Sequence, residues 1–129
     1  KELELAMRHS EEITCDAELE FENSLSYLAR ELERLGPFGI GNPQPRLLCR
    51  DLRVESQRVL KEQHLKLRVA CGKQSVDAIA WRRAELAEDL AEGTRFDAVA
   101  ELTINKWAGR SDPQLELLEV NVDGPVTIA

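Results

Sequence analysis

Cationic side chains alternate with apolar ones in one short segment, which offers the clearest chemistry in the 129-residue sequence. Between positions 64 and 71, His64, Lys66 and Arg68 occupy one side while leucines, a valine and a cysteine occupy the other. This period of two indicates a half-buried β-strand. A row of cations suits the phosphates of a nucleic-acid strand, and nearby aromatic rings suit its bases. We therefore predict that this face binds nucleic acid.

A tryptophan in a polar segment supplies the second part of the candidate site. Trp107 stands between Lys106 and Arg110 in segment 106–113, which we expect to be a loop. It has no evident core to fill, so stacking on a base and a structural role both stay open. Trp81 ends an apolar segment, so the core is its expected place, with a stacking platform as the less favoured alternative. Three further cations complete the predicted binding set, and they are Arg50, Lys73 and Arg82.

Catalytic chemistry is poorly supported by the sequence. The two histidines, His9 and His64, lie far apart, and no His, Asp or Glu cluster has metal-ligand spacing. The sequence also lacks a Gly-rich loop followed by Lys-Ser/Thr and a nucleophile elbow. Asp16 and Glu18 face the same way on an expected strand, but carboxylates in an acidic segment are usually solvated. We predict no catalytic residue, no metal site and no cofactor in this chain.

Charge is unevenly distributed along the chain, although the net value is −7. Residues 36–83 carry 10 Lys/Arg against four Asp/Glu. Residues 1–35 carry four against 10, and residues 84–129 carry three against 10. This pattern predicts a basic patch on an acidic body, which a phosphate backbone would contact. A solvated basic face without a ligand is the alternative.

Composition favours a cytoplasmic protein. The three cysteines form an odd set without C-x-x-C spacing, which indicates reduced, buried thiols rather than disulfides or zinc ligands. No apolar run approaches the ~20 residues of a membrane span. The sequence begins without Met, inside a charged amphipathic stretch, so we expect it to be a piece of a longer protein.

Hydrophobic periodicity predicts a mainly β fold with flanking helices. We expect the third and fourth of five strands to be separated by a helix, and the first strand to contain a bend or bulge. The order β-β-β-α-β-β in about 75 residues is that of the OB-fold, a five-stranded Greek-key barrel. The expected strands are 46–54, 64–71, 75–81, 96–105 and 114–122, the helix is 83–92, and a polar turn is expected at 57–63.

The region before the barrel divides into two parts. A helix is expected at 23–35 and a loose strand at 13–19, both within a region 1–35 that would end a preceding domain. Segment 36–45 holds three glycines and three prolines, so no helix continues through it. Phe38 and Ile40 would anchor this rigid connector, for which a ligand contact is the less favoured interpretation. The barrel would occupy 46–122, and 123–129 would be a tail.

Four sequence blocks in order carry a family resemblance. They are LGPFGIGNPQP at 35–45, HLKL at 64–67, DAIAW at 77–81, and NKWAG followed by QL between 105 and 115. Together they resemble the OB domain of RecJ-type single-stranded-DNA-specific exonucleases, over most of the chain from about Ile13 to Val122. Gly36 and Trp81 depart slightly from the usual family pattern.

The resemblance implies more than the residues show. Enzymes of this family degrade single-stranded DNA from the 5′ end in recombination and repair, with Mn²⁺ or Mg²⁺ bound by a DHH core. That core and its DHHA1 partner domain would precede Lys1, and no Asp-His-His occurs here. The DNA-holding barrel is what carries over, with single-stranded DNA and the preceding catalytic domains as partners and a single-strand-binding protein as a further candidate.

Two other functions remain open from the sequence. The barrel could serve as a structural brace or protein-docking module without touching nucleic acid, which the acidic flanks would favour. An intact small enzyme is disfavoured by the missing ligand sets. Salt-dependent oligonucleotide binding separates the first alternative from DNA binding, because phosphate contacts release counterions.

Overall fold

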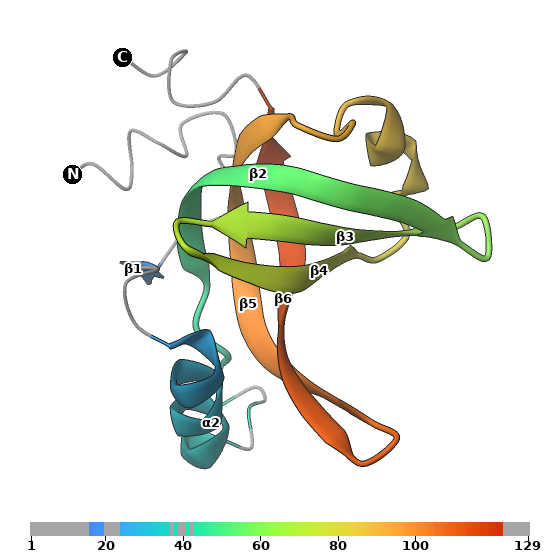
Figure 1. Cartoon of the computed structure of the whole chain (residues 1–129). Coiled ribbons are helices and arrows are strands. Elements are labelled where there is room, and N and C mark those ends of the chain that lie inside the picture. The colour runs from blue at the N-terminus through green and yellow to red at the C-terminus, as the bar shows by residue number, and fades with distance from the viewer. Residues whose placement is uncertain (1–15, 20–23, 37, 39–40, 42, 123–129) are drawn as a thin grey trace.

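The computed structural model describes residues 16–19, 24–36, 38, 41 and 43–122, with the side chain of Trp107 excepted. A small barrel of five strands dominates it, with one α-helix outside (Figure 1). The elements in chain order are β1 (Ala17–Glu18), α2 (Leu25–Leu35), β2 (Leu47–Leu60), β3 (His64–Cys71), β4 (Gln74–Ala80), the 3₁₀-helix η1 (Ala84–Glu88), β5 (Arg95–Trp107) and β6 (Arg110–Asn121).

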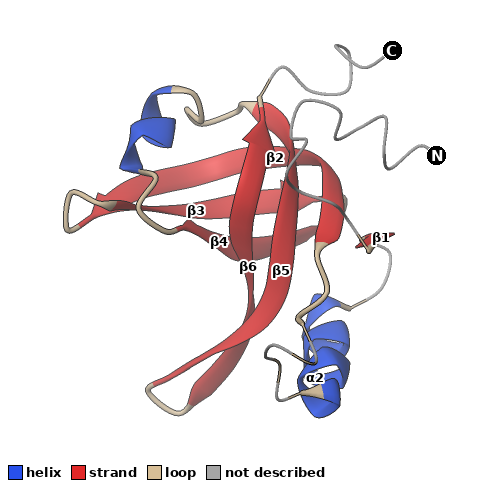
Figure 2. Cartoon of the chain, turned by 180° about the vertical axis from the view of Figure 1, so that it is seen from behind, coloured by secondary structure: helices blue, strands red, loops and turns tan. Residues whose placement is uncertain are grey.

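One strand closes the barrel by pairing on both of its sides. The first part of β2 pairs with β5, while its second part pairs with β3. The sheet order is β1-β2-β3-β4-β6-β5, with β4 and β6 parallel and β2–β5 closing the ring. Strands β2, β3 and β4 form one wall of the barrel. Strands β5 and β6 cross behind this wall in Figure 1 and in front of it in Figure 2. This is the predicted five-stranded arrangement, with a helical turn between its third and fourth strands.

The predicted bend in the first barrel strand is confirmed. The β2–β5 register shifts between Cys49 and Leu52, and a second shift against β3 follows between Val54 and Ser56. Asp51 adopts a φ of 57°, a left-handed conformation that a non-glycine residue enters only at a cost. The backbone N–H of Asp51 donates a hydrogen bond of 2.9 Å to the carboxylate of Asp97 on β5. Asp97 therefore supports the bulge that turns β2 from one neighbour to the other.

The polar turn predicted at 57–63 is wrong over its first half, because β2 runs on to Leu60. Backbone pairing with β3 continues to the pair Leu60–His64, and only Lys61, Glu62 and Gln63 turn. Gln57 is polar but points to the barrel end, where its side-chain amide donates to the carbonyls of Ala87 and Leu90 at 2.8 and 3.1 Å. Polar composition marked a turn here, whereas the strand pairing and these bonds decide the structure.

The helix predicted at 83–92 is present only as the five-residue 3₁₀-helix η1. Its hydrogen bonds run from Leu86 N–H to Arg83 C=O and from Asp89 N–H to Leu86 C=O, each 3.0 Å. No side chain caps its N-terminus. Leu86 and Leu90 are buried against the barrel. The segment thus plugs one end of the barrel without extending into an α-helix.

The loop predicted at 106–113 is also wrong, because β5 and β6 continue into it as a hairpin. Only Ala108 and Gly109 turn the chain, with φ values of 50° and 77°. Two consecutive residues with positive φ are the geometry of a tight two-residue hairpin. The hairpin extends beyond the barrel at the end where α2 lies (Figures 1 and 2).

Helix α2 packs on the outside of the barrel, as its apolar stripe predicted. Ser24 caps it by accepting a bond of 3.2 Å from Tyr27 N–H, and Gly36 ends it. Leu25 and Ala29 are buried, and the partly buried Phe38 lines a small cavity between α2 and β5. Of the strand expected at 13–19, Ala17 and Glu18 pair with β2; residues 13–15, Ile40 and the tail 123–129 lie outside the described residues. No helix in the described part of the chain is long and apolar enough to span a membrane.

Asp97 gives a test of the bulge through the pH dependence of stability. Burial chiefly raises its pKa above the ordinary value of 3.8, against the bond from Asp51 N–H and the charge of Arg50. The folded chain holds this proton more tightly, so the stability it contributes is complete below 3.8 and is lost as pH rises through the folded-state pKa. Asp97→Asn should therefore gain in free energy of unfolding relative to the parent as pH rises toward neutral, measured by urea unfolding.

Asp97→Ala is the companion variant, because it also removes the acceptor for Asp51 N–H. It should lose about 1–3 kcal/mol at neutral pH. Glu101 also has a pKa raised by burial, but it is present in every variant and cancels in the difference. Parallel stability curves for the parent and Asp97→Asn would contradict this account.

Candidate nucleic-acid interface

The outer face of β3 carries the three residues that the sequence placed there. Leu65, Leu67 and Val69 are buried in the core, so the alternation of the strand turns His64, Lys66 and Arg68 to the other side. Lys66 is half-buried and Arg68 is exposed. These side chains lie on the wall made by β2, β3 and β4, which faces the viewer in Figure 1.

Arg58 belongs to the same face, although sequence reasoning missed it. The register pairs Arg58 on β2 with Lys66 on β3, and Lys66 with Ile79 on β4. Paired residues of neighbouring strands project to the same side, so two cations stand next to each other. The feature that places Arg58 on this face is the continuation of strand β2 to Leu60, which the polar composition of 57–63 obscured.

Trp81 lies at the end of this face and is 51% exposed, so its expected place in the core is wrong. Strand β4 ends at Ala80, and Arg82 with a φ of 60° turns the chain away. The Trp81 ring meets His64 edge-on, with centroids 5.0 Å apart. Arg82 N–H donates to His64 Nδ1 at 2.9 Å, which leaves Nε2 as the ring donor of a neutral imidazole. The Trp81 ring is therefore in contact with His64, while half of the side chain remains exposed to solvent.

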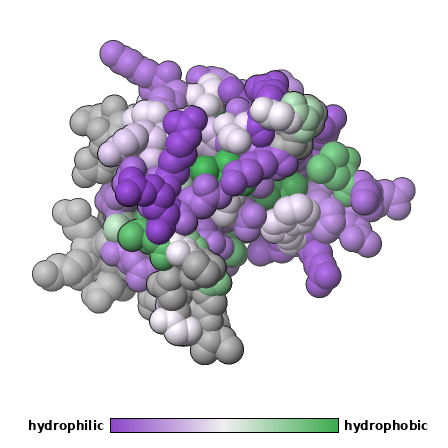
Figure 3. Space-filling view, turned by 90° about the horizontal axis from the view of Figure 1, so that it is seen from below, coloured by the Kyte–Doolittle hydropathy of each residue, from purple (hydrophilic) through white to green (hydrophobic). Residues whose placement is uncertain are grey.

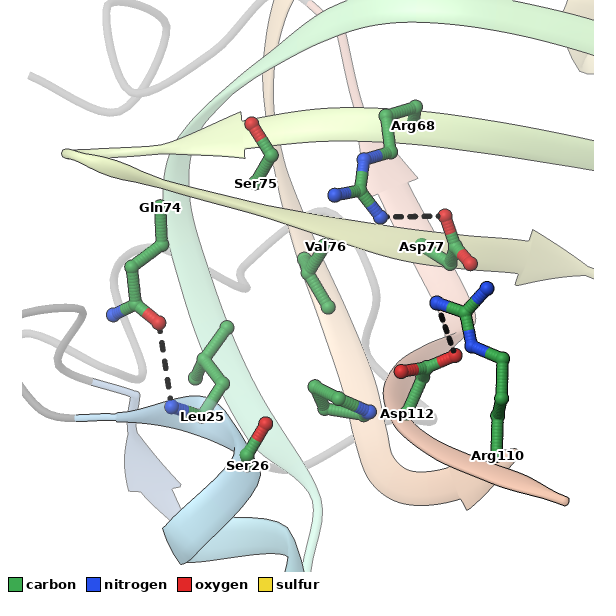
Figure 4. A pocket seen from close by; sticks show the side chains of 10 residues that line it. Leu25, Ser26, Arg68, Gln74, Ser75, Val76, Asp77, Arg110 and Asp112 are labelled. Atoms are coloured by element: carbon green, nitrogen blue, oxygen red, sulfur yellow. Dashed lines mark hydrogen bonds and ion pairs between the residues drawn. The ribbon is translucent and has the colours of Figure 1, made fainter. Parts of the chain in front are cut away.

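A polar cavity of about 260 Å³ opens where β4, the β5–β6 hairpin and the start of α2 meet (Figure 4). Arg68 Nη1 lies 2.9 Å from Asp77 Oδ1, and Arg110 Nη2 lies 3.4 Å from Asp112 Oδ2. Both ion pairs line the cavity. Two predicted binding residues on distant segments, Arg68 and Arg110, are thus brought together, and each has a carboxylate partner.

The remaining predicted residues are dispersed. Lys106 Nζ lies 3.1 Å from Glu33 of α2, and Arg50 Nε lies 3.4 Å from Glu18 of β1, on the β2–β5 side of the barrel. Lys73 is exposed at the β3–β4 turn. Only the backbone of Trp107 is described, at the end of β5 beside the hairpin turn. Viewed from the end where α2 lies, the surface is largely hydrophilic, with small separate hydrophobic patches (Figure 3).

Two buried thiols lie in the interior of the described part of the barrel. Cys49 and Cys71 are free and buried, and burial raises the pKa of Cys71 to about 12, so it stays a thiol. Among the residues that the structure describes, no three His, Cys, Asp or Glu side chains gather closely enough to hold a metal ion.

The five-stranded barrel defines an OB-fold domain. The second single-stranded-DNA-binding protein of Mycobacterium smegmatis shares the fold, with a TM-score of 0.51 at 19% identity over 60% of this chain and 84% of its own. The predicted fold class is confirmed. The sequence model of the RecJ OB domain matches residues 15–119, and the chain belongs to this family.

Two longer relatives agree with this family. The single-stranded-DNA-specific exonuclease RecJ of Bacillus subtilis is 31% identical over 94 residues, which are 71% of this chain and 12% of that protein. RecJ of Thermus thermophilus, in complex with Mg²⁺, matches with a TM-score of 0.62 and 28% identity, over 84% of this chain and 16% of its own. The chain thus spans less than a fifth of either relative.

The position of Trp81 predicts a small structural role. Trp81→Ala should lower the free energy of unfolding by less than about 2 kcal/mol, because half of the side chain is already in solvent. Phe96→Ala is the control, since Phe96 is 1% exposed and should lose about 3–5 kcal/mol. Urea unfolding followed by circular dichroism measures both. Equal losses in free energy of unfolding for the two variants would contradict the exposed position of Trp81.

Proposed function

We propose that the chain binds single-stranded DNA across the outer wall of β2, β3 and β4, as the OB domain of a RecJ-type exonuclease. The observation that carries the proposal is the adjacent pair Arg58 and Lys66, with half-exposed Trp81 at the end of the same wall. In the described part of the chain, neither cation forms an ion pair with a carboxylate. Unpaired cations beside an exposed ring suit a flexible polyanion with bases.

The groups divide by chemistry. Arg58, Lys66 and Arg82 offer charge to successive phosphates, whereas Trp81 offers a flat apolar surface to a base. Trp107 would supply a second stacking surface from the hairpin, where Arg110 is its cross-strand neighbour. Such contacts read the backbone and ring faces, so the proposed binding has little dependence on base sequence.

For the parent enzyme, we propose 5′-to-3′ digestion of single-stranded DNA in recombination and repair in the cytoplasm. Mg²⁺ or Mn²⁺ and the catalytic residues would belong to DHH and DHHA1 domains of the longer chain, and a single-strand-binding protein would be a further partner. The role of this chain would be to hold the strand. The isolated chain should then leave labelled single-stranded DNA intact in the presence of Mn²⁺, and cleavage that survives purification controls would contradict this division.

A structural brace is the second candidate, and a specific observation favours it. Arg50, Arg68, Lys106 and Arg110 are each within ion-pair distance of a carboxylate, so much of the predicted charge is already neutralised. Tyr27 and Leu35 of α2 are 62% and 65% exposed, which offers apolar surface to another domain. A brace would bind oligonucleotides weakly and without the salt slope of phosphate contacts.

The cations give the first test of the proposal. Arg58→Ala, Lys66→Ala and Arg68→Ala should each weaken binding of a labelled oligonucleotide similarly for all base sequences. Each should also lower the slope of log K against log salt by about 0.7, because one phosphate contact is lost. Fluorescence anisotropy across a salt series measures this effect. Arg34→Ala on α2 removes the same charge away from the wall and should keep the parent slope; variants on the wall that also keep it would favour the brace.

The aromatic groups give a separate test. Trp81→Ala and Trp107→Ala should each cost about 1–3 kcal/mol of binding free energy through lost stacking, with little change in the salt slope. Trp81→Phe should retain most of the affinity. Tyr27→Ala is the control, because Tyr27 is an exposed aromatic side chain outside the wall. A Trp81→Ala variant that binds like the parent would remove this residue from the proposed site.

A further inference from the structure

We propose that Asp77 and Asp112 limit the affinity of the proposed site for DNA. Each aspartate holds an arginine in an ion pair, and a DNA phosphate must displace the aspartate to bind that arginine. The inference rests on the proposed function and assigns a role to carboxylates of the binding face. Each arginine exchanges its aspartate for a phosphate when DNA binds, and it pairs with the aspartate again when the DNA strand moves on.

The geometry makes the two carboxylates direct competitors of a phosphate. Asp77 is the cross-strand neighbour of Arg68, with 2.9 Å between Oδ1 and Nη1. Asp112 lies two residues from Arg110 on β6, with 3.4 Å between Oδ2 and Nη2. Figure 4 shows all four side chains around one cavity, with the two ion pairs marked by dashed lines. An anion that enters the cavity meets equal numbers of positive and negative groups from these pairs.

Exposure makes the exchange possible. The side chains of Arg68 and Asp77 are 48% and 29% exposed, and those of Arg110 and Asp112 are 66% and 37% exposed. Ion pairs this open to water hold their partners weakly, within about fivefold in an equilibrium constant. A phosphate can therefore displace each carboxylate, but the displaced charge stays nearby and repels it.

The proposed site then has two kinds of cation. Arg58 and Lys66 are open to phosphate at all times, whereas Arg68 and Arg110 are returned to an internal partner whenever the strand leaves. Such a partner lowers the cost of releasing DNA, and differences in affinity among variants of one interface lie mainly in the dissociation rate. This property suits a domain that must let a strand pass through it.

The experiment neutralises the aspartates in the 129-residue chain. Asp77→Asn and Asp112→Asn should each bind a labelled oligothymidylate about two- to fivefold more tightly at low salt, with the gain in a slower dissociation rate by stopped flow. Glu31→Gln is the matched control, because it frees Arg34 from an arginine–carboxylate pair on α2 and should leave affinity unchanged. Thermal unfolding confirms that each variant is folded.

A double-mutant cycle separates local exchange from general charge. In an Arg68→Ala background, Asp77→Asn should give a clearly smaller gain, because only the repulsion of the phosphate by Asp77 is removed and no arginine is released. An equal gain in that background, or an Asp77→Asn variant that binds no more tightly than the parent, would overturn the inference.

The proposed function can fail separately. If the parent chain binds no oligonucleotide, the double variant Asp77→Asn/Asp112→Asn still decides the inference. Binding that appears only in the double variant supports it, and continued absence of binding overturns it.

Discussion

Strand β2 is the constraint on which the rest of the structure depends. Its first part pairs with β5 and its second part with β3, so the barrel closes only if this strand changes direction between them. The change occurs at Asp51, whose left-handed backbone is held by the buried carboxylate of Asp97. Burial of a carboxylate is costly unless it accepts hydrogen bonds. Closure of the barrel at the β2 bend therefore depends on a polar side chain, Asp97, that is buried in the interior.

The same bend determines where the candidate site lies. Beyond Val54, β2 is free of β5 and runs alongside β3 to Leu60, which places Arg58 opposite Lys66. The buried side of this wall is fixed by Leu65 and Leu67 in the core, so the cations can leave only outward. Gln57 ties β2 to the η1 segment through two carbonyls and holds the end of the barrel closed. The adjacent position of Arg58 and Lys66 is thus a consequence of barrel closure.

Much of this could be predicted from sequence, and the failures have physical causes. The strand at 64–71 was predicted with its true bounds, because strict alternation has a single interpretation when one face is buried. Positions 57–60, 106–107 and 110–113 are strand residues that the sequence predicts in a turn and a loop, because the segments 57–63 and 106–113 are rich in polar residues, whereas ladder hydrogen bonds involve only the backbone. Trp81 was expected in the core because it follows apolar residues; the chain reversal at Arg82, which exposes it, depends on tertiary context. Ion pairs such as Arg68 with Asp77 depend on register, which composition does not contain.

Ion pairing explains how a chain with a net charge of −7 can offer a basic surface. Charges more than about 10 Å apart are largely screened at about 0.1 M salt, so the local balance decides what a ligand meets. Carboxylates neutralise Arg50 and Arg95 on the β2–β5 side and Lys106 against α2. Arg58 and Lys66 have no such partner in the described part of the chain. By pairing with Arg50, Arg95 and Lys106 elsewhere, the acidic residues leave Arg58 and Lys66 as two adjacent cations without an ion-pair partner on this wall, in the described part of the chain.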